Sequence, residues 1–145
     1  MRWNDAKAVL KDEGPILREV PDSLAVTLTA LSDGTPVVAR VAHSRLSETL
    51  TFAVDVRAAE TASPREVLAV SRDLVPGNSV LIEGTPCPVL GELAYVNGAL
   101  AVRYVTKLAD VCADDLRRIV QSLATQARLL RARLCAAAPN AATFA

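Results

Sequence analysis

Apolar and polar residues alternate in two regions of the chain. Between residues 24 and 56 the alternation predicts three antiparallel strands, residues 24–31, 37–42 and 46–56, joined by tight turns. A second hairpin is predicted for residues 89–96 and 99–106, because the Asn97-Gly98 pair between them tolerates the positive φ angles of a tight turn. Strands of this kind form an antiparallel sheet with one apolar face and one polar face.

After residue 111 the apolar period changes to that of a helix, about 3.6 residues per turn. Placed at about 100° per residue, the apolar side chains fall within an arc of about 100°, the width of one buried helix face. We therefore predict a long helix laid over the sheet, with a core stripe that consists of Leu116, Ile119, Val120, Leu123, Ala127, Leu130 and Leu134.

Shorter elements complete the predicted fold. A short helix follows Trp3 and is expected to end at Gly14-Pro15. The capping box Ser63-Pro64-Arg65-Glu66 begins another helix, which we expect to run to about Leu74. Residues 16–20 are predicted to form a short edge strand, and residues 80–83 a further short strand followed by an irregular link.

The predicted order is helix, three strands, helix, two or three strands, helix. This order indicates an α+β fold in which helices pack on an antiparallel sheet. Residues 1–135 are expected to form a single domain, and residues 136–145 a flexible tail of mostly small residues.

The apolar residues around the second predicted helix cover an arc of about 160°, wider than the ~100° that one contact needs. We therefore expect burial on two sides. Val67 and Leu74 are assigned to the sheet side, and Leu68 and Val75 to a two-fold contact with a second copy of the chain. Together these four residues are the predicted homodimer interface.

Length and composition limit the class of protein. The chain has 145 residues, of which 51% are hydrophobic, so one domain with a substantial core is expected. No apolar run approaches the ~20 residues of a membrane span. The N-terminal residues carry charges and do not resemble a signal peptide. We therefore expect a cytoplasmic protein without membrane segments.

The charge is unevenly distributed, although the formal net charge is zero. Residues 1–115 hold 16 acidic and 11 basic side chains, and residues 116–145 hold five arginines and no acid. These arginines have two interpretations, a solvated outer helix face or a docking face for an acidic protein partner. Nucleic acid is not expected, because aromatic residues make up only 3% of the chain. The possible partner face consists of Arg117, Arg118, Arg128, Arg131 and Arg133.

No catalytic, metal or cofactor site is predicted. The only histidine, His43, falls in a predicted turn and is expected to be solvated. The widely spaced Cys87, Cys112 and Cys135 match neither a metal-ligand spacing nor a disulfide framework, and are expected to be reduced thiols. A small enzyme that uses Cys87 or Cys112 as a thiolate at a helix N-terminus is a third, less favoured hypothesis.

Residues 91–134 carry a family resemblance. A strand ends in a short link, and a helix then begins with Cys112, the acids Asp114-Asp115 and the pattern Leu116-x-x-Ile119. This segment, with the order of elements, resembles the small α+β fold of type III secretion chaperones that escort effectors and of YbjN-type bacterial regulators.

The resemblance implies a homodimer without catalysis. In the chaperones the middle helix and neighbouring strands form the dimer interface, and the first helix and sheet expose apolar grooves for an unfolded client segment. The first hypothesis is therefore a dimeric protein-binding module that holds an extended segment of a client protein. The alternative is a YbjN-like cytoplasmic adaptor or regulator that binds a folded partner.

Overall fold

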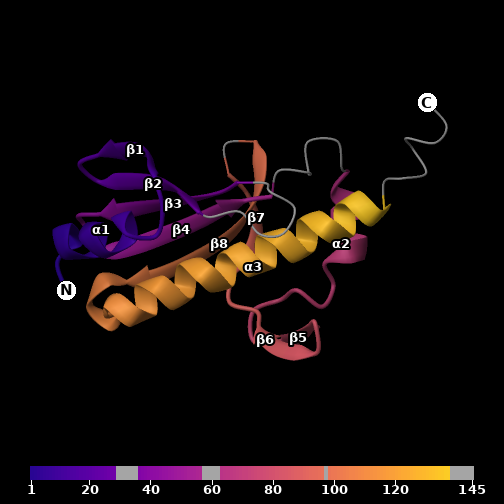
Figure 1. Ribbon diagram of the computed structural model, residues 1–145. Helices are drawn as coiled ribbons and strands as arrows, with labels where there is room; N and C mark the ends of the chain where they lie inside the picture. Colours follow the sequence, from indigo (N-terminus) through magenta and orange to yellow (C-terminus); the bar gives the residue numbers. More distant parts are fainter. Residues whose placement is uncertain (29–35, 57–62, 97, 138–145) are drawn as a thin grey trace.

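A long antiparallel sheet carries one long helix on one of its faces (Figure 1). The computed structural model describes residues 1–28, 36–56, 63–96 and 98–137. Their elements in chain order are α1 (Trp3–Lys11), β1 (Ile16–Val20), β2 (Ser23–Leu28), β3 (Val37–Ser44), β4 (Thr49–Asp55), α2 (Pro64–Val70), β5 (Ser79–Ile82), β6 (Thr85–Pro88), β7 (Glu92–Val96), β8 (Ala99–Lys107) and α3 (Ala113–Ala137). A 3₁₀ turn (Leu108–Asp110) links β8 to α3.

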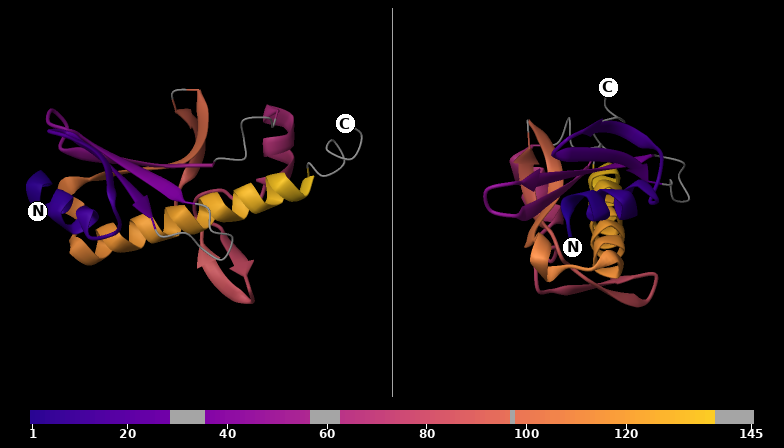
Figure 2. Two further views of the ribbon diagram at one scale, coloured as in Figure 1. Left: turned by 45° about the horizontal axis from the view of Figure 1, so that its top comes forward. Right: turned by 90° about the vertical axis from the view of Figure 1, so that its left-hand side faces the viewer.

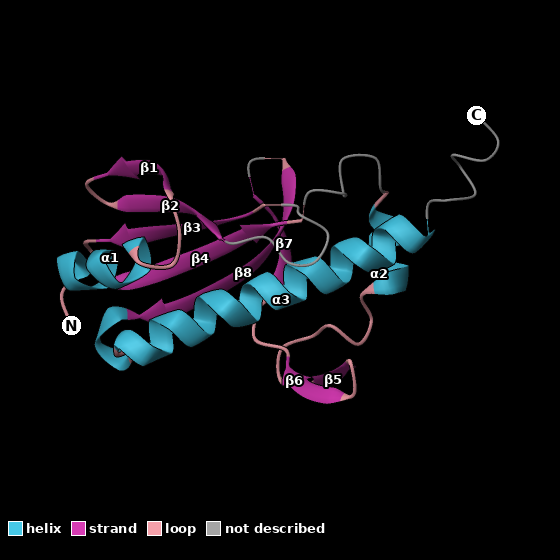
Figure 3. Ribbon diagram, in the orientation of Figure 1, coloured by secondary structure: helices cyan, strands magenta, loops and turns pink. Residues whose placement is uncertain are grey.

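Within the described residues the main sheet has six strands in the order β1-β2-β3-β4-β8-β7, and every neighbouring pair is antiparallel. The C-terminal hairpin β7–β8 joins the N-terminal strands through β4 and β8. Strands β5 and β6 form a separate hairpin, which lies on the side of α3 opposite to the main sheet (Figures 1 and 2). The predicted α+β class, with helices packed on an antiparallel sheet, is confirmed (Figure 3).

The core lies between the sheet and helices α1 and α3. Every residue of the predicted core stripe of α3 is buried. Against this stripe pack the inward side chains of the central strands, including Leu50, Phe52, Val54 and Val102. Helix α1 adds Trp3, Ala6 and Leu10 to the same core. A 3.6-residue apolar period was therefore sufficient to locate the buried face of α3.

Helix α2 is shorter than expected. It begins at the predicted cap, where Ser63 Oγ accepts from the Glu66 backbone N–H at 3.2 Å, but it ends at Val70. The guanidinium of Arg133 on α3 donates to the Val70 carbonyl at 2.9 Å, which satisfies one of the carbonyls that the last turn of the helix leaves free. Leu74 and Val75 therefore follow α2 rather than belonging to it, and the 160° arc does not describe one helix.

Three further local predictions differ from the structure. Strand β3 continues through Ser44, because the β3–β4 pairing reaches Ser44 and Thr49, so His43 lies in a strand and not in a turn. The expected irregular link at residues 85–88 is strand β6, paired with β5. Helix α3 extends to Ala137, two residues into the predicted tail.

Some predictions fall outside the described residues. These are the turn at Asp33-Gly34, residue Asn97 of the second hairpin turn, and the tail from residue 138 onward. Gly98, the neighbour of Asn97, has φ of 81°, which fits the predicted tight turn. Among the described helices, none is long and apolar enough to cross a membrane.

Candidate protein-binding site

Strand β1 is an outer edge of the main sheet and is exposed along its whole length. Its apolar side chains are Ile16, Leu17 and Val20, of which Leu17 is 62% exposed. One side of β1 pairs with β2, and no described strand pairs with the other side. An edge strand of this kind presents unpaired backbone N–H and C=O groups to any extended chain that lies beside it.

Glu19, the charged residue of β1 on the helix side, forms ion pairs with two lysines of α1. Glu19 Oε2 lies 2.7 Å from Lys11 Nζ and 3.1 Å from Lys7 Nζ. The hydrogen bond from Lys11, and then that from Lys7, lowers the pKa of Glu19. Lys7 Nζ also donates to the Val20 carbonyl at 3.2 Å. Helix α1 therefore holds β1 in place while leaving its outer edge open.

The turn after β1 is anchored by the Trp3 side chain, which packs on His43 of β3. Trp3 Nε1 donates to the Pro21 carbonyl at 2.7 Å. The Trp3 ring stacks on His43 with a centroid distance of 5.2 Å. The bond to Pro21 fixes the C-terminal end of β1 against α1, because Pro21 directly follows the strand and Trp3 belongs to α1.

His43 corrects the expectation of a solvated turn histidine, since its side chain is only 7% exposed. Its Nε2 lies 3.1 Å from a Glu48 carboxylate oxygen, and its Nδ1 lies 3.5 Å from Asp22. The strand alternation of β3 turns the ring toward α1, where Trp3 covers it. His43 thus lies between two carboxylates.

The four residues of the predicted dimer interface divide into two pairs. Val67 and Leu74 are buried, whereas Leu68 is 63% and Val75 is 45% exposed. Helix α2 lies beside the C-terminal end of α3 (Figure 2), where Arg133 pairs with Asp73 at 2.6 Å. Leu68 and Val75 are thus the members of this set that another molecule can reach.

The five arginines of α3 are distributed around the helix. At about 100° per residue, Arg117, Arg128 and Arg131 lie on one side, whereas Arg118 and Arg133 project elsewhere. Arg117 pairs with Asp114 at 3.1 Å, and Arg133 pairs with Asp73 on the α2 side. The structure therefore does not gather these arginines into the single partner face that the sequence suggested.

The cysteines lie in three separate places. Cys112 is exposed just before α3, and its backbone N–H donates to Asp115 Oδ2 at 3.0 Å. This bond and a side-chain bond from Cys112 lower the pKa of Asp115. A helix N-terminus or a neighbouring cation stabilises a thiolate, whereas the side chain that bonds Cys112 here is a carboxylate. Cys135 is exposed near the end of α3.

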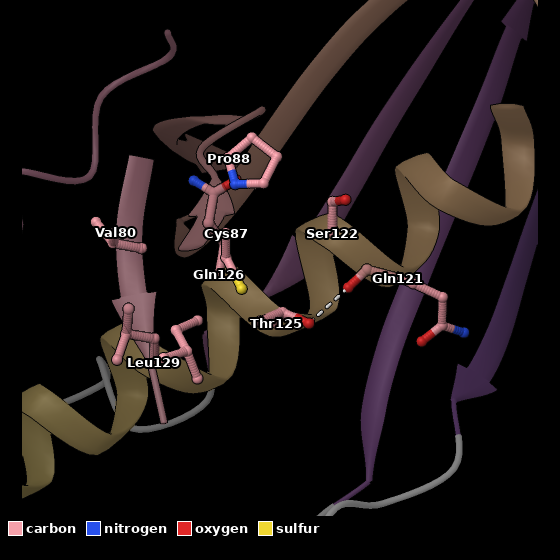
Figure 4. Close-up of a pocket in the computed structure, with 9 residues that line it drawn as sticks. Val80, Cys87, Pro88, Gln121, Ser122, Thr125, Gln126 and Leu129 are labelled. Carbon is pink, nitrogen blue, oxygen red and sulfur yellow. Dashed lines mark hydrogen bonds between the residues drawn. The ribbon is translucent and has the colours of Figure 1, made fainter. Parts of the chain in front are cut away.

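Cys87 lines a hollow of about 160 Å³ between the β5–β6 hairpin and α3. Val80 of β5 and Leu129 of α3 contribute apolar side chains to this hollow (Figure 4). Its hydroxyl groups include that of Thr125, which donates to the Gln121 carbonyl at 2.9 Å. Over the described ranges, no group of three histidine, cysteine or acidic side chains is placed to hold a metal ion.

Sequence reasoning identified β1 as an edge strand but not as an apolar binding surface. The available signal was the run Ile16-Leu17 with Val20, which leaves apolar residues on both faces of a short strand. Comparisons with known proteins add no relative, because no family model, no curated protein and no solved structure matches the chain.

Proposed function

We propose that this chain is a non-catalytic protein-binding module, similar to type III secretion chaperones, that holds an extended segment of a client protein. The observation that carries the proposal is the open outer edge of β1, with its exposed apolar side chains. Addition of a strand to such an edge is a general mode of peptide recognition, in which backbone hydrogen bonds supply affinity and alternate side chains supply specificity.

The side chains of β1 indicate which residue types a client segment would carry. Strand register places Ile16, which pairs with the core residue Val26, on the helix face of the sheet, and Val20, which pairs with Ser23, on the opposite face. The register shifts between Ile16 and Arg18, so simple alternation does not hold through Leu17. A client strand beside β1 would place apolar residues next to these side chains on both faces. A segment of four to six residues with apolar residues on both faces fits the five-residue length of β1.

The proposal includes a homodimer. Leu68 and Val75 are apolar, exposed and close to the end of α3, and pairing with the same patch of a second copy would cover them. Such a dimer would carry two β1 edges, one from each copy, for one long client or for two clients.

The function is tested by capture of clients from the native host on immobilised protein, followed by mass spectrometry. The wild-type chain is compared with Leu17→Lys, which places a charge on the β1 edge, and with Leu46→Lys as the matched control. Leu46 is fully exposed in the β3–β4 turn and does not belong to the β1 edge. We expect Leu17→Lys to lose a client that Leu46→Lys retains.

Hydrogen exchange on the purified complex then locates the contact. Those amides of residues 16–20 that point away from β2 should gain protection when the client binds, because an added strand takes up their free N–H groups. Unchanged exchange in β1, or retention of the client by Leu17→Lys, would exclude the edge as the binding site. A client that binds only as a folded domain, without protection of β1, would favour the adaptor hypothesis instead.

A further inference from the structure

The face of the main sheet that points away from α3 carries a row of arginines and alanines. Strand register places one residue from each strand side by side across the sheet. Neighbouring strands lie about 4.8 Å apart, and consecutive arginines of the row are two strands apart. The backbones of consecutive arginines are therefore about 10 Å apart. In the order of the strands from β1 to β7, the row consists of Arg18, Ala25, Arg40, Ala53, Arg103 and Glu92.

A trough of about 370 Å³ lies over one part of this row, between Arg18 and Arg40. Its floor includes Ala25, Ala42 and Ala53, whose side chains end at Cβ and leave room between the longer arginine side chains. Val96, at the end of β7, also lines the trough. Because β1 and β7 are opposite edges of the sheet, residues of both can line one trough only if the sheet is curled. Figure 2 shows that the strands are strongly curved.

The charges in the trough are incompletely matched. Arg40 Nη2 donates to Asp55 at 2.6 Å, whereas Arg40 Nε is buried and has no hydrogen-bond partner in the described part of the chain. Arg18 forms no ion pair with any described acid. Arg103, farther along the row, pairs with Glu92 at 3.6 Å and does not line the trough. Two cations therefore line the trough, whereas Asp55, the carboxylate that binds Arg40, is not among its lining residues.

We propose that this trough binds a small organic carboxylate with a short apolar body. The planar guanidinium group presents N–H donors in a fork that matches the two oxygens of a carboxylate. The carboxylate would lie between the guanidinium groups of Arg18 and Arg40, and the apolar body would lie on the three alanines. The volume is within the range of about 300–1,000 Å³ that is usual for small-molecule sites.

The chemistry of the trough disfavours a nucleotide, because no aromatic side chain among its lining residues offers a surface for a base. The trough is also distinct from the proposed client edge. Arg18 faces the trough, whereas the client would occupy the outer side of β1. This inference therefore goes beyond the proposed function and does not depend on it.

The test is a titration of the full-length protein with octanoate, followed by NMR of the alanine methyl groups. Octanol serves as the uncharged probe of the same length, and inorganic phosphate as an anion without an apolar body. We expect saturable shifts of the Ala25, Ala42 and Ala53 methyls with octanoate, and at least tenfold weaker binding of both other probes.

Three variants locate the site. Arg18→Gln should weaken octanoate binding at least tenfold by removing an unmatched cation at an exposed position. Ala42→Leu should abolish binding by filling the floor. Arg103→Gln is the matched control, since it removes an arginine of the same row outside the trough and should change the dissociation constant less than twofold.

Several outcomes would overturn the inference. Equal binding of octanol and octanoate would mean a non-specific apolar contact. Equal losses in Arg18→Gln and Arg103→Gln would mean a general charge effect, and tighter binding of inorganic phosphate than of octanoate would contradict a carboxylate site. If Ala42→Leu fails to fold, Arg18→Gln and Arg103→Gln still decide the question.

Discussion

The buried amide of Gln126 joins α3 to the chain segment between β6 and β7. Its Oε1 accepts from the backbone N–H groups of Leu90 and Gly91, at 3.0 and 2.9 Å, and its Nε2 donates to the Gly91 carbonyl at 2.9 Å. These are backbone groups that no strand ladder satisfies, and Gln126 itself is buried. A buried polar group without a partner destabilises a fold. The Gln126 side chain therefore supplies the hydrogen bonds that a helix or strand would otherwise give these backbone groups.

Gln126→Ala should therefore lower the free energy of unfolding by about 2–4 kcal/mol, because it leaves buried N–H and C=O groups unpaired. Urea denaturation measures this change. Gln121→Ala, an exposed glutamine on the same helix that bonds Glu13, is the control and should change stability by less than about 0.5 kcal/mol. Equal effects of the two substitutions would mean that the Gln126 bonds contribute little.

Gly91 lies so close to the core that a side chain has no room. A Cβ atom there would lie 2.5 Å from Leu123 Cδ2 and 2.5 Å from Val102 Cγ1. Gly91→Ala should destabilise the protein by about 1–3 kcal/mol through overpacking. Leu123→Ala alone should cost about 2–5 kcal/mol, because Leu123 is in the buried core stripe.

A double-mutant cycle measured by urea denaturation tests the contact. In the Leu123→Ala background the clash with Leu123 is removed, so Gly91→Ala should cost less than it does in the wild type. Strict additivity of the two substitutions would show that the two side chains do not compete for the same space. A loss below about 0.5 kcal/mol for Leu123→Ala would contradict its place in the core.

At the scale of elements, Arg133 binds the C-terminal end of α2 to α3. Its two terminal nitrogens lie 2.6 and 3.0 Å from the two carboxylate oxygens of Asp73, and one of them also donates to the Val70 carbonyl. The hydrogen bond from Arg133 lowers the pKa of Asp73, and Asp73 raises the pKa of Arg133. This contact connects α2 to α3 across more than 60 residues of sequence.

The contribution of this pair should depend on pH. The pKa of Asp73 is lower in the folded than in the unfolded protein, so its stabilisation is complete above the ordinary aspartate pKa of about 3.9 and is lost as the pH falls through the lowered value. The Asp73 side chain is more than half exposed, so the stabilisation should be below about 1 kcal/mol.

Asp73→Asn should accordingly speed amide exchange in α2 at pH 7, and the difference from the wild type should vanish at the lowest pH that keeps the protein folded. Asp12→Asn is the control, because the Asp12 side chain makes no hydrogen bond or ion pair within the described ranges. If the difference in amide exchange between Asp73→Asn and the wild type persists unchanged at low pH, the interaction of Asp73 with Arg133 does not depend on charge.

At the scale of the whole molecule, the exposed pair Leu68 and Val75 predicts association. Leu68→Glu would place two like charges close together across a two-fold axis, in a region that the dimer removes from water. Light scattering at micromolar concentration should give twice the chain mass for the wild type and the single chain mass for Leu68→Glu. The circular dichroism of the two proteins should agree, because Leu68 is not a core residue.

Leu46→Glu provides the matched control for this prediction, since Leu46 is equally apolar, fully exposed and placed in the β3–β4 turn away from α2. It should remain dimeric. A wild-type protein of single chain mass would exclude the homodimer. Dissociation by both substitutions would show that added charge, and not the position of Leu68, disrupts the association.

Local patterns in the sequence were sufficient for much of the fold. Each of these features depends on residues that are close together in the sequence. They are the core stripe of α3, the cap at Ser63 and the alternation of β2 to β4. Periodicity and capping act over such short distances, so they can be recognised without a structure. The same reasoning identified β1 as an edge strand, and separated Val67 and Leu74 from Leu68 and Val75.

Contacts between distant residues decided the rest. Arg133 bonds the last residue of α2, Val70, and Trp3 covers His43, which the sequence placed in water. The row that contains Arg18, Arg40 and Arg103 exists only because strand register brings three distant segments side by side. Register depends on the pairing of whole strands and on which face the helices cover, and no short stretch of sequence contains that information.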